Sequence, residues 1–351
     1  MDLYRSLVLL PTLLVVSLLS SSSSAQRSTA NPNAIQQAGE VLRFLDDLPN
    51  RQNDRLIISQ DLGHGNSIGS NYQSYVGGIY EQTGKWIGMI GGDYGLDPNH
   101  NIAQSTNIFI EHWYAGGLVT ISWHLDNPWT GGDSWDTNNN EDLRELITPG
   151  SPVYDRWQIQ LAEIANALRP LRDAGVVVLW RPFHEVNGDW FWWGAKNWSG
   201  HEQAFIDVYR QMFDYLTNQQ GMNNLLWVYS AADTYEQSLK NYYPGPQYVD
   251  VVGIDIYSDT MDTWFTNRDY NDLVSLGHPM GITEHGPTLA TANGSYDYRR
   301  LLGNTFSKWP EAAFVHVWHD WPGANVSILS NLYTWELMNS PYTLTRENID
   351  W

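Results

Sequence analysis

Residues 176–185 read VVVLWRPFHE, and they establish the fold class expected for the whole chain. The stretch is apolar and β-branched without polar alternation, and it ends in Arg181, His184 and Glu185. A strand whose successive side chains are all apolar is buried on both faces, which is typical of a parallel sheet. Polar residues at the end of such a strand are expected at the edge of the sheet, where they can face a site.

Working outward in both directions, the chain contains eight apolar, β-branched runs of this kind. We predict a buried strand in each of them. The runs are Leu56–Gln60, Trp86–Tyr94, Leu118–His124, Val176–Glu185, Leu225–Ser230, Val249–Tyr257, Pro279–Gly286 and Ala313–Asp320.

Stretches with the 3.6-residue periodicity of helices lie between most of these runs. They include Tyr154–Ala174, Glu202–Leu216 and Tyr298–Trp309, and Gly175 stands where a C-terminal glycine stop is expected. Eight strands alternating with helices predict a single-domain (β/α)8 TIM barrel over residues 26–351. The alternative is a doubly wound open sheet, which is disfavoured because no glycine-rich phosphate-binding turn follows any run.

Composition narrows the class of partner. The formal charge of −20, from 39 acidic against 19 basic residues, disfavours nucleic acid and anionic lipid, since the field of the protein repels phosphates. Cysteine is absent, so neither disulfides nor thiolate chemistry is available. The 18 Trp and 20 Tyr suit sugars, whose apolar faces stack on flat rings, although aromatic residues also fill cores.

The N-terminal residues 1–25 have the features of a secretory signal peptide. Arg5 precedes an apolar run from Leu7 to Leu19, and a serine tract then leads to Ala25. The run is short for a membrane span, which disfavours the alternative of an N-terminal anchor helix. We therefore expect a secreted protein with no membrane contact after cleavage. The sequons at Asn197, Asn293 and Asn325 matter only in a eukaryotic secretory route.

Two glutamates end the fourth and seventh runs, Glu185 and Glu284. In a barrel these strands lie across from each other, and glycoside hydrolysis needs two carboxyl groups that flank one bond. Strict alternation along the fourth run would place Arg181, Phe183 and Glu185 on one face. Arg181 is then expected to stabilise an ionised partner, although a purely structural ion pair is an equal alternative.

The histidines raise the question of a metal. Those near strand ends or loops are His112, His124, His184, His285, His316 and His319. No His-x-x-x-His or His-Glu-x-x-His spacing occurs, so we expect neither a metal nor a cofactor. His316 and His319 would point to opposite faces if both lay within a strand.

Several strand ends together resemble glycoside hydrolase family 26, which contains mostly β-mannanases with some β-glucanases and xylanases. The string from Trp180 to Gly194 is the most specific part of the resemblance. Shorter matching pieces are Ser122-Trp123-His124 with Asn127-Pro128, Asp255-Ile256-Tyr257, Thr283-Glu284-His285-Gly286 and Val317-Trp318. The resemblance covers essentially the whole chain after the signal peptide.

The resemblance implies a role for each matching residue. Glu185 would be the general acid/base and Glu284 the nucleophile, with no metal or cofactor. The substrate-binding residues would be His124, Trp129, Arg181, His184, Trp190, Tyr257 and Trp318. Among these, His184 would contact the sugar near its 2-hydroxyl, Tyr257 would hydrogen-bond the nucleophile, Trp318 would form a stacking floor, and Trp129 would stack a neighbouring sugar. His285 stands where many family members carry an aromatic residue such as Phe.

The implied function is that of a secreted, monomeric, endo-acting retaining hydrolase. It would cleave internal β-1,4-mannosidic bonds of mannan, glucomannan and galactomannan by double displacement. The alternatives are a β-1,3-1,4-glucanase or β-xylanase of the same family and a non-catalytic carbohydrate-binding barrel. The last is disfavoured because both glutamates are present. The polar loop of residues 126–140 is expected to line distal subsites, unless it is an ordinary surface loop.

Overall fold

The computed structural model describes residues 27–95, 102–138, 142–196, 199–234 and 237–351. The predicted signal peptide, residues 1–25, lies outside the described residues. Within them, no helix combines the length and the apolar character needed to cross a membrane.

The strands are β1 (Leu56–His64), β2 (Met89–Asp93), β3 (Leu118–Trp123), β4 (Val178–Pro182), β5 (Leu225–Ala232), β6 (Val251–Tyr257), β7 (Met280–Gly286), β8 (Ala312–Val317) and β9 (Thr343–Leu344). The α-helices are α1 (Gln36–Asp47), α2 (Ser67–Asn71), α3 (Gly78–Thr83), α4 (Ile102–Tyr114), α5 (Tyr154–Asp173), α6 (His201–Asp214), α7 (Thr266–Ser275), α8 (Arg299–Lys308) and α9 (Thr334–Met338). Each of the eight predicted runs overlaps one of the strands β1 to β8, although β1, β5 and β8 extend beyond the predicted bounds at one end.

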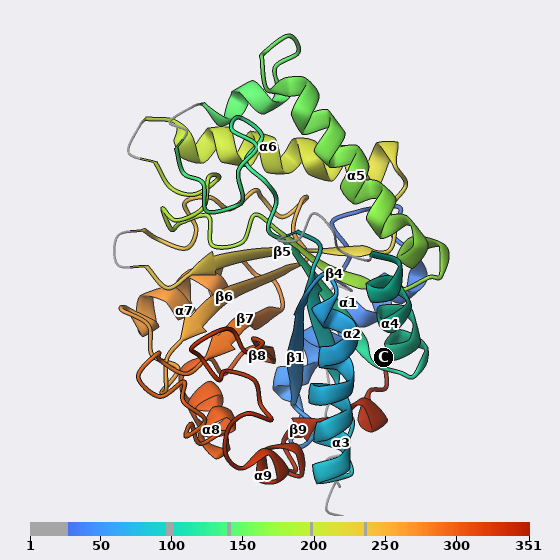
Figure 1. The fold of residues 1–351 in the computed structure, drawn as a ribbon, viewed down its shortest axis with the longest axis vertical. Helices are drawn as coiled ribbons and strands as arrows, with labels where there is room; N and C mark the ends of the chain where they lie inside the picture. The colour runs from blue at the N-terminus through green and yellow to red at the C-terminus, as the bar shows by residue number, and fades with distance from the viewer. Residues whose placement is uncertain (1–26, 96–101, 139–141, 197–198, 235–236) are drawn as a thin grey trace, which may run out of the picture.

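The strands close into a parallel barrel, as the sequence predicts. Strands β1 to β8 pair in chain order, and β1 pairs with both β8 and β2, which completes the ring. All of these pairs are parallel, and β9 adds a short parallel pairing to β1 outside the ring. In Figure 1 the strands lie at the centre, with α5 and α6 on one side and α7 and α8 on another. The prediction of a (β/α)8 barrel is therefore confirmed.

One connection differs from the regular alternation. Between β5 and β6 the described residues form turns instead of an α-helix. Pro244-Gly245-Pro246 interrupts this connection, and Gly245 has a φ of 107°, in the left-handed region. Proline lacks the backbone donor that a helix interior needs and clashes with the preceding turn, which explains the missing helix.

The helices cover the barrel with apolar stripes at helical spacing. Helix α5 buries Trp157, Leu161, Ile164, Leu168 and Leu171 on one face. Gly175, with a φ of 69°, follows it and donates its backbone N–H to the Arg172 carbonyl. This left-handed glycine ends the helix where the sequence predicts the stop.

The buried carboxylate of Asp250 connects the segment before α1 to the amino ends of the strands. Asp250, which directly precedes β6, accepts hydrogen bonds from the backbone N–H groups of Ala30 at 2.6 Å and Trp227 at 2.8 Å. Burial raises the pKa of Asp250 to about 6, and the two backbone donors oppose that shift. Asp250 therefore lies at the amino ends of the strands, whereas Glu185 and Glu284 lie at the opposite end of the barrel, at the carboxyl ends.

Candidate active site

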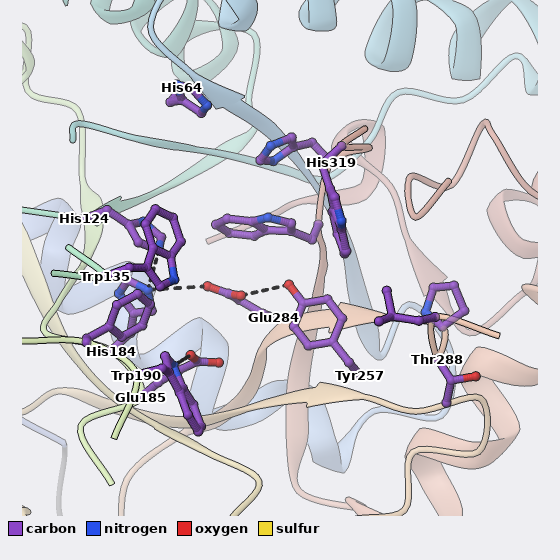
Figure 2. Close-up of a pocket in the computed structure, with 15 residues that line it drawn as sticks. His64, His124, Trp135, His184, Glu185, Trp190, Tyr257, Glu284, Thr288 and His319 are labelled. Atoms are coloured by element: carbon purple, nitrogen blue, oxygen red, sulfur yellow. Dashed lines mark hydrogen bonds and ion pairs between the residues drawn. The ribbon is translucent and has the colours of Figure 1, made fainter. Parts of the chain in front are cut away.

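The carboxyl ends of the strands surround a cavity of about 720 Å³. In a parallel barrel every strand ends at this face, so residues far apart in the chain meet there. Of the residues predicted to form the site, the cavity is lined by His124, His184, Glu185, Trp190, Tyr257, Glu284 and Trp318. Figure 2 shows Glu284 near the centre, between His184 and Tyr257, with Trp190 beside Glu185.

Glu185 reaches the cavity by a backbone path that differs from the one predicted. Strand β4 ends at Pro182, and both Phe183 and Glu185 have positive φ angles, 51° and 57°. Alternation therefore stops at Pro182, and the prediction that Arg181, Phe183 and Glu185 share one face is wrong. The Phe183 ring packs instead against Trp157 and Phe205 in the core, with centroid distances of 5.9 Å and 5.7 Å.

Among the described side chains, Trp190 supplies the hydrogen-bond donor to the Glu185 carboxyl group. The indole N–H of Trp190 donates to its Oε2 at 2.6 Å. Burial, followed by the nearby charges of Asp255 and Glu284, raises the pKa of Glu185 well above its ordinary value. This carboxyl group therefore favours the protonated form, which a general acid requires.

Glu284, on β7, lies in a richer donor environment. Arg181 Nη2 donates to its Oε1 at 2.5 Å, and the Tyr257 hydroxyl donates to its Oε2 at 2.9 Å. Burial and the charge of Asp255 raise the pKa of Glu284, while Arg181 acts to lower it. Because donors hold both oxygens of Glu284 and one holds Glu185, a shared proton is expected to reside on Glu185.

Arg181 is the buried cation that connects the carboxylates. Its Nη1 donates to Asp255 Oδ2 at 3.1 Å, in addition to the ion pair with Glu284. The Oδ1 of Asp255 accepts a hydrogen bond from the Ser230 hydroxyl at 3.0 Å. Arg181 thus forms an ion pair with each of two carboxylates, of which Glu284 lines the cavity.

The three carboxylates are close together. One oxygen from each of Glu185, Asp255 and Glu284 lies within 4.8 Å of the other two. Among the described residues, these three side chains form the one group of potential ligands that is compact enough to hold a metal ion. Arg181 already places a guanidinium against two of the three, so an added cation would face a like charge at short range.

A chain of imidazoles leads from Asp93 to Glu284. His124 Nδ1 lies 2.7 Å from Asp93 Oδ2, and His124 Nε2 lies 3.0 Å from His184 Nε2. A donating Nδ1–H on His124 leaves its Nε2 as the acceptor, so His184 Nε2–H is the donor. Burial lowers the pKa of His184 well below its ordinary value, which keeps this ring neutral.

The aromatic residues predicted for the site divide into two groups. Trp318 lines the cavity, with the Arg181 guanidinium carbon 5.9 Å from its ring centroid. Trp129 does not line this cavity: its ring meets Trp192 edge-on at 5.8 Å, and its indole N–H donates to Glu145. From the same loop, Trp135 is half exposed, lines the cavity and stacks on His124 at 5.4 Å.

Several residues that the structure brings to the site have no role predicted from the sequence. Asp93 and Asp61 hold imidazoles, and Asp255 holds Arg181. The signal that could have found them is an acidic residue within an otherwise apolar strand run or directly after it. His316 and His319 both contact Asp61, because β8 ends at Val317 and strand alternation does not extend to His319.

Comparisons with known proteins bear on the family. The model of glycosyl hydrolase family 26 matches residues 30–348. A mannan endo-1,4-beta-mannosidase of Bacillus subtilis is 33% identical, with 93% of this chain and 94% of that protein covered. Mannan endo-1,4-beta-mannosidase A and B of Caldalkalibacillus mannanilyticus is 34% identical over 96% of this chain and 66% of its own length. A solved mannanase of Bacillus subtilis superimposes with a TM-score of 0.82 at 28% identity, covering 92% of this chain and 96% of that one.

Proposed function

The chain belongs to glycosyl hydrolase family 26, and from this premise we propose that it hydrolyses internal β-1,4-mannosidic bonds by double displacement, with retention of configuration. The endo-mannanase activity agrees with the relatives named mannan endo-1,4-beta-mannosidase, which align over nearly the whole chain. The residue roles and the stereochemistry rest on the geometry of the cavity.

The observation that carries the mechanism is the short gap between the carboxyl groups. An oxygen of Glu185 lies within 4.8 Å of an oxygen of Glu284. Retaining glycosidases place the two groups about 5–5.5 Å apart, whereas inverting enzymes need about 6.5–9.5 Å to admit a water molecule. The gap supports direct attack by one carboxylate on the sugar.

In the first step, the ionised Glu284 attacks the anomeric carbon and Glu185 donates its proton to the departing glycosidic oxygen. In the second step, Glu185 accepts a proton from water, and the water oxygen displaces Glu284 from the anomeric carbon. Two inversions give net retention. The proton on Glu185 is favoured by its burial, while Arg181 and Tyr257 stabilise the anionic Glu284.

The remaining residues of the cavity position the sugar. His184 Nε2 lies 4.0 Å from Glu284 Oε1, which places a neutral imidazole beside the carbon under attack. The exposed faces of Trp135 and Trp190 offer stacking surfaces, and Trp318 lies beneath Arg181. Trp129 lies behind this surface, so its assignment to a neighbouring subsite stays a prediction.

The activity is tested by incubating the purified protein with mannan, glucomannan, galactomannan, barley β-glucan and xylan, and by sizing the released oligosaccharides. Internal cleavage of the mannans is expected; preferential cleavage of barley glucan or xylan would favour the alternative substrates. Proton NMR of the first product tests the stereochemistry. The β-anomer must appear first, and early appearance of the α-anomer would overturn the retaining mechanism.

We also propose that the protein is secreted and acts as a monomer on galactomannan as well as on unbranched mannan. Residues 1–25, the basis of the secretion proposal, lie outside the described residues. This one chain supplies all the cavity residues to which we give a role. N-terminal sequencing of the exported protein and analytical ultracentrifugation test the two proposals.

A further inference from the structure

A second cavity, of about 680 Å³, lies on the flank of the barrel, where the β6–α7 connection and helix α7 meet the end of α8. It shares no lining residue with the catalytic cavity. Three rings line it, those of Trp264, Phe265 and Tyr270, together with charged side chains that include Asp262, Arg268 and Lys308. We call this second cavity the flank groove.

The rings of the flank groove are presented to solvent. Trp264 is 68% exposed and Phe265 is 42% exposed, although both are large apolar side chains. The backbone beneath them is held in place, since Trp264 N–H donates to Asp233 Oδ1 at 2.9 Å. The Arg268 guanidinium lies 4.4 Å from the Phe265 ring centroid and covers one face of that ring. The groove therefore offers flat, exposed rings on an anchored backbone, and such rings suit stacking.

Each charged side chain of the flank groove forms an ion pair with a neighbouring side chain of opposite charge. Lys308 forms an ion pair with Asp262 at 2.5 Å, and Arg268 forms one with Asp269 at 2.7 Å. Paired charges leave little net field to attract a charged ligand, but their polar atoms still offer hydrogen bonds. Exposed rings beside balanced polar groups favour an uncharged ligand with many hydroxyl groups, which is the chemistry of a neutral polysaccharide.

We propose that the flank groove is a non-catalytic binding site for the β-mannan chain that the catalytic cavity hydrolyses. This proposal rests on the proposed function. A polymer held weakly at one place presents its other segments to the catalytic cavity at a raised effective concentration. A short oligosaccharide gains nothing from this, because the molecule that occupies the groove has no remaining sugar units to offer.

The central experiment compares Trp264→Ala with the unsubstituted protein on two substrates. We expect binding to insoluble β-mannan, measured in the inactive Glu284→Ala background, to weaken about 3- to 10-fold, as loss of one stacking ring implies. In the active protein, hydrolysis of insoluble mannan falls with it, while kcat/KM for soluble mannotetraose stays unchanged. Trp264→Phe, which keeps a ring, should retain part of the binding.

The matched control is Trp335→Ala, which removes a similarly exposed indole from helix α9 (55% exposed). It should change neither the binding and hydrolysis of insoluble mannan nor kcat/KM for mannotetraose. Wild-type binding and hydrolysis of insoluble mannan by Trp264→Ala would overturn the proposal. An equal loss on mannotetraose would overturn it too, because the ring would then serve the catalytic cavity. A change from dimer to monomer on substitution would assign the groove to a subunit interface instead.

The two proposals fail in distinguishable ways. An unsubstituted protein that does not cleave mannotetraose contradicts the proposed function. Trp264-dependent binding of the Glu284→Ala protein to insoluble mannan would support the groove even then, because that measurement needs no turnover. Cleavage of mannotetraose together with binding that is independent of Trp264 contradicts the groove alone.

Discussion

Each end of the barrel buries carboxylates, but the hydrogen-bond donors that hold them differ between the two ends. At the amino ends of the strands, Asp250 is held by the backbone N–H groups of Ala30 and Trp227. At the carboxyl ends, Glu284 is held by the side chains of Arg181 and Tyr257, and it lines a cavity. Burial raises the pKa of both groups. A raised pKa is therefore common to both groups, whereas a second carboxyl group nearby and access to a cavity distinguish Glu284, and these two features support its proposed role.

The largest difference between the two ends is expected in turnover. Glu185→Ala and Glu284→Ala should each lower kcat about 10⁴-fold or more, since neither residual carboxyl group can perform both chemical roles. The measurement is the initial rate of mannan hydrolysis, with circular dichroism as the check on folding. A folded variant of either kind that kept wild-type turnover would remove that residue from the mechanism.

Arg181→Met should come next, with an effect on stability as well as on activity. It leaves Asp255 and Glu284 buried without their cation, so the free energy of unfolding at pH 7 should fall by about 3–5 kcal/mol. The loss should shrink as the pH is lowered, because the two carboxylates then become protonated. Urea unfolding at pH 7 and pH 5 measures both effects. The matched control is Arg144→Met, whose ion pair with Asp142 is exposed on both sides, and it should leave the free energy of unfolding almost unchanged.

Tyr257→Phe should change how activity depends on pH. The hydroxyl donates to Glu284, so its loss raises the pKa of that carboxyl group further. The proposed mechanism requires an ionised Glu284, and activity should therefore be lost at a higher pH as the solution is acidified. We expect kcat at neutral pH to fall about 10-fold. An unchanged acidic limb in the pH profile of kcat/KM would argue that Glu284 does not control it.

Trp135→Ala and Trp129→Ala compare two rings of one loop. Trp135 lines the cavity and Trp129 does not, so kcat/KM should fall about 10-fold for the first and less than about 2-fold for the second. Mannotetraose and mannohexaose are suitable substrates. A larger loss for Trp129 on the longer substrate would support its predicted place beside a neighbouring sugar.

The smallest effect on turnover is expected at the amino ends of the strands. Asp250→Asn should leave kcat unchanged but cost about 1–3 kcal/mol of stability at pH 7, since an amide NH2 then faces a backbone N–H. In the wild type, burial raises the pKa of Asp250 from 3.8 to about 6, so its folded form holds the proton more tightly. Its contribution to stability should consequently decline between those two pH values as the pH rises, and Asp250→Asn should lose this dependence.

The strands and the position of the two glutamates at the cavity could be predicted because both depend on local signals. Continuous apolar runs mark buried strands, and a carboxylate ending such a run is conspicuous. The backbone turn after Pro182 could not be predicted, because Phe and Glu seldom adopt a positive φ and nothing local marks it. The same limit applies to the choice between Trp129 and Trp135, since side-chain direction in a long loop depends on its tertiary contacts.

The acidic residues that hold the site's histidine and arginine side chains could not be predicted from the sequence either. Asp93 meets His124, and Asp255 meets Arg181, through the pairing of neighbouring strands and the closure of the ring. Such contacts join residues that are far apart in the chain, and spacing within one segment carries no information about them.

The left-handed backbone at Glu185 has a consequence for engineering. A glutamate with a φ of 57° is held in a conformation that glycine and asparagine adopt more readily, and burial of its carboxyl group adds a second cost. Replacing Glu185 by glycine should relieve both costs. The inactive Glu185→Gly variant is therefore expected to have a higher melting temperature than the wild type. A selection for heat resistance alone would then discard catalysis at this position, and stabilisation campaigns on this scaffold should screen for turnover at every round.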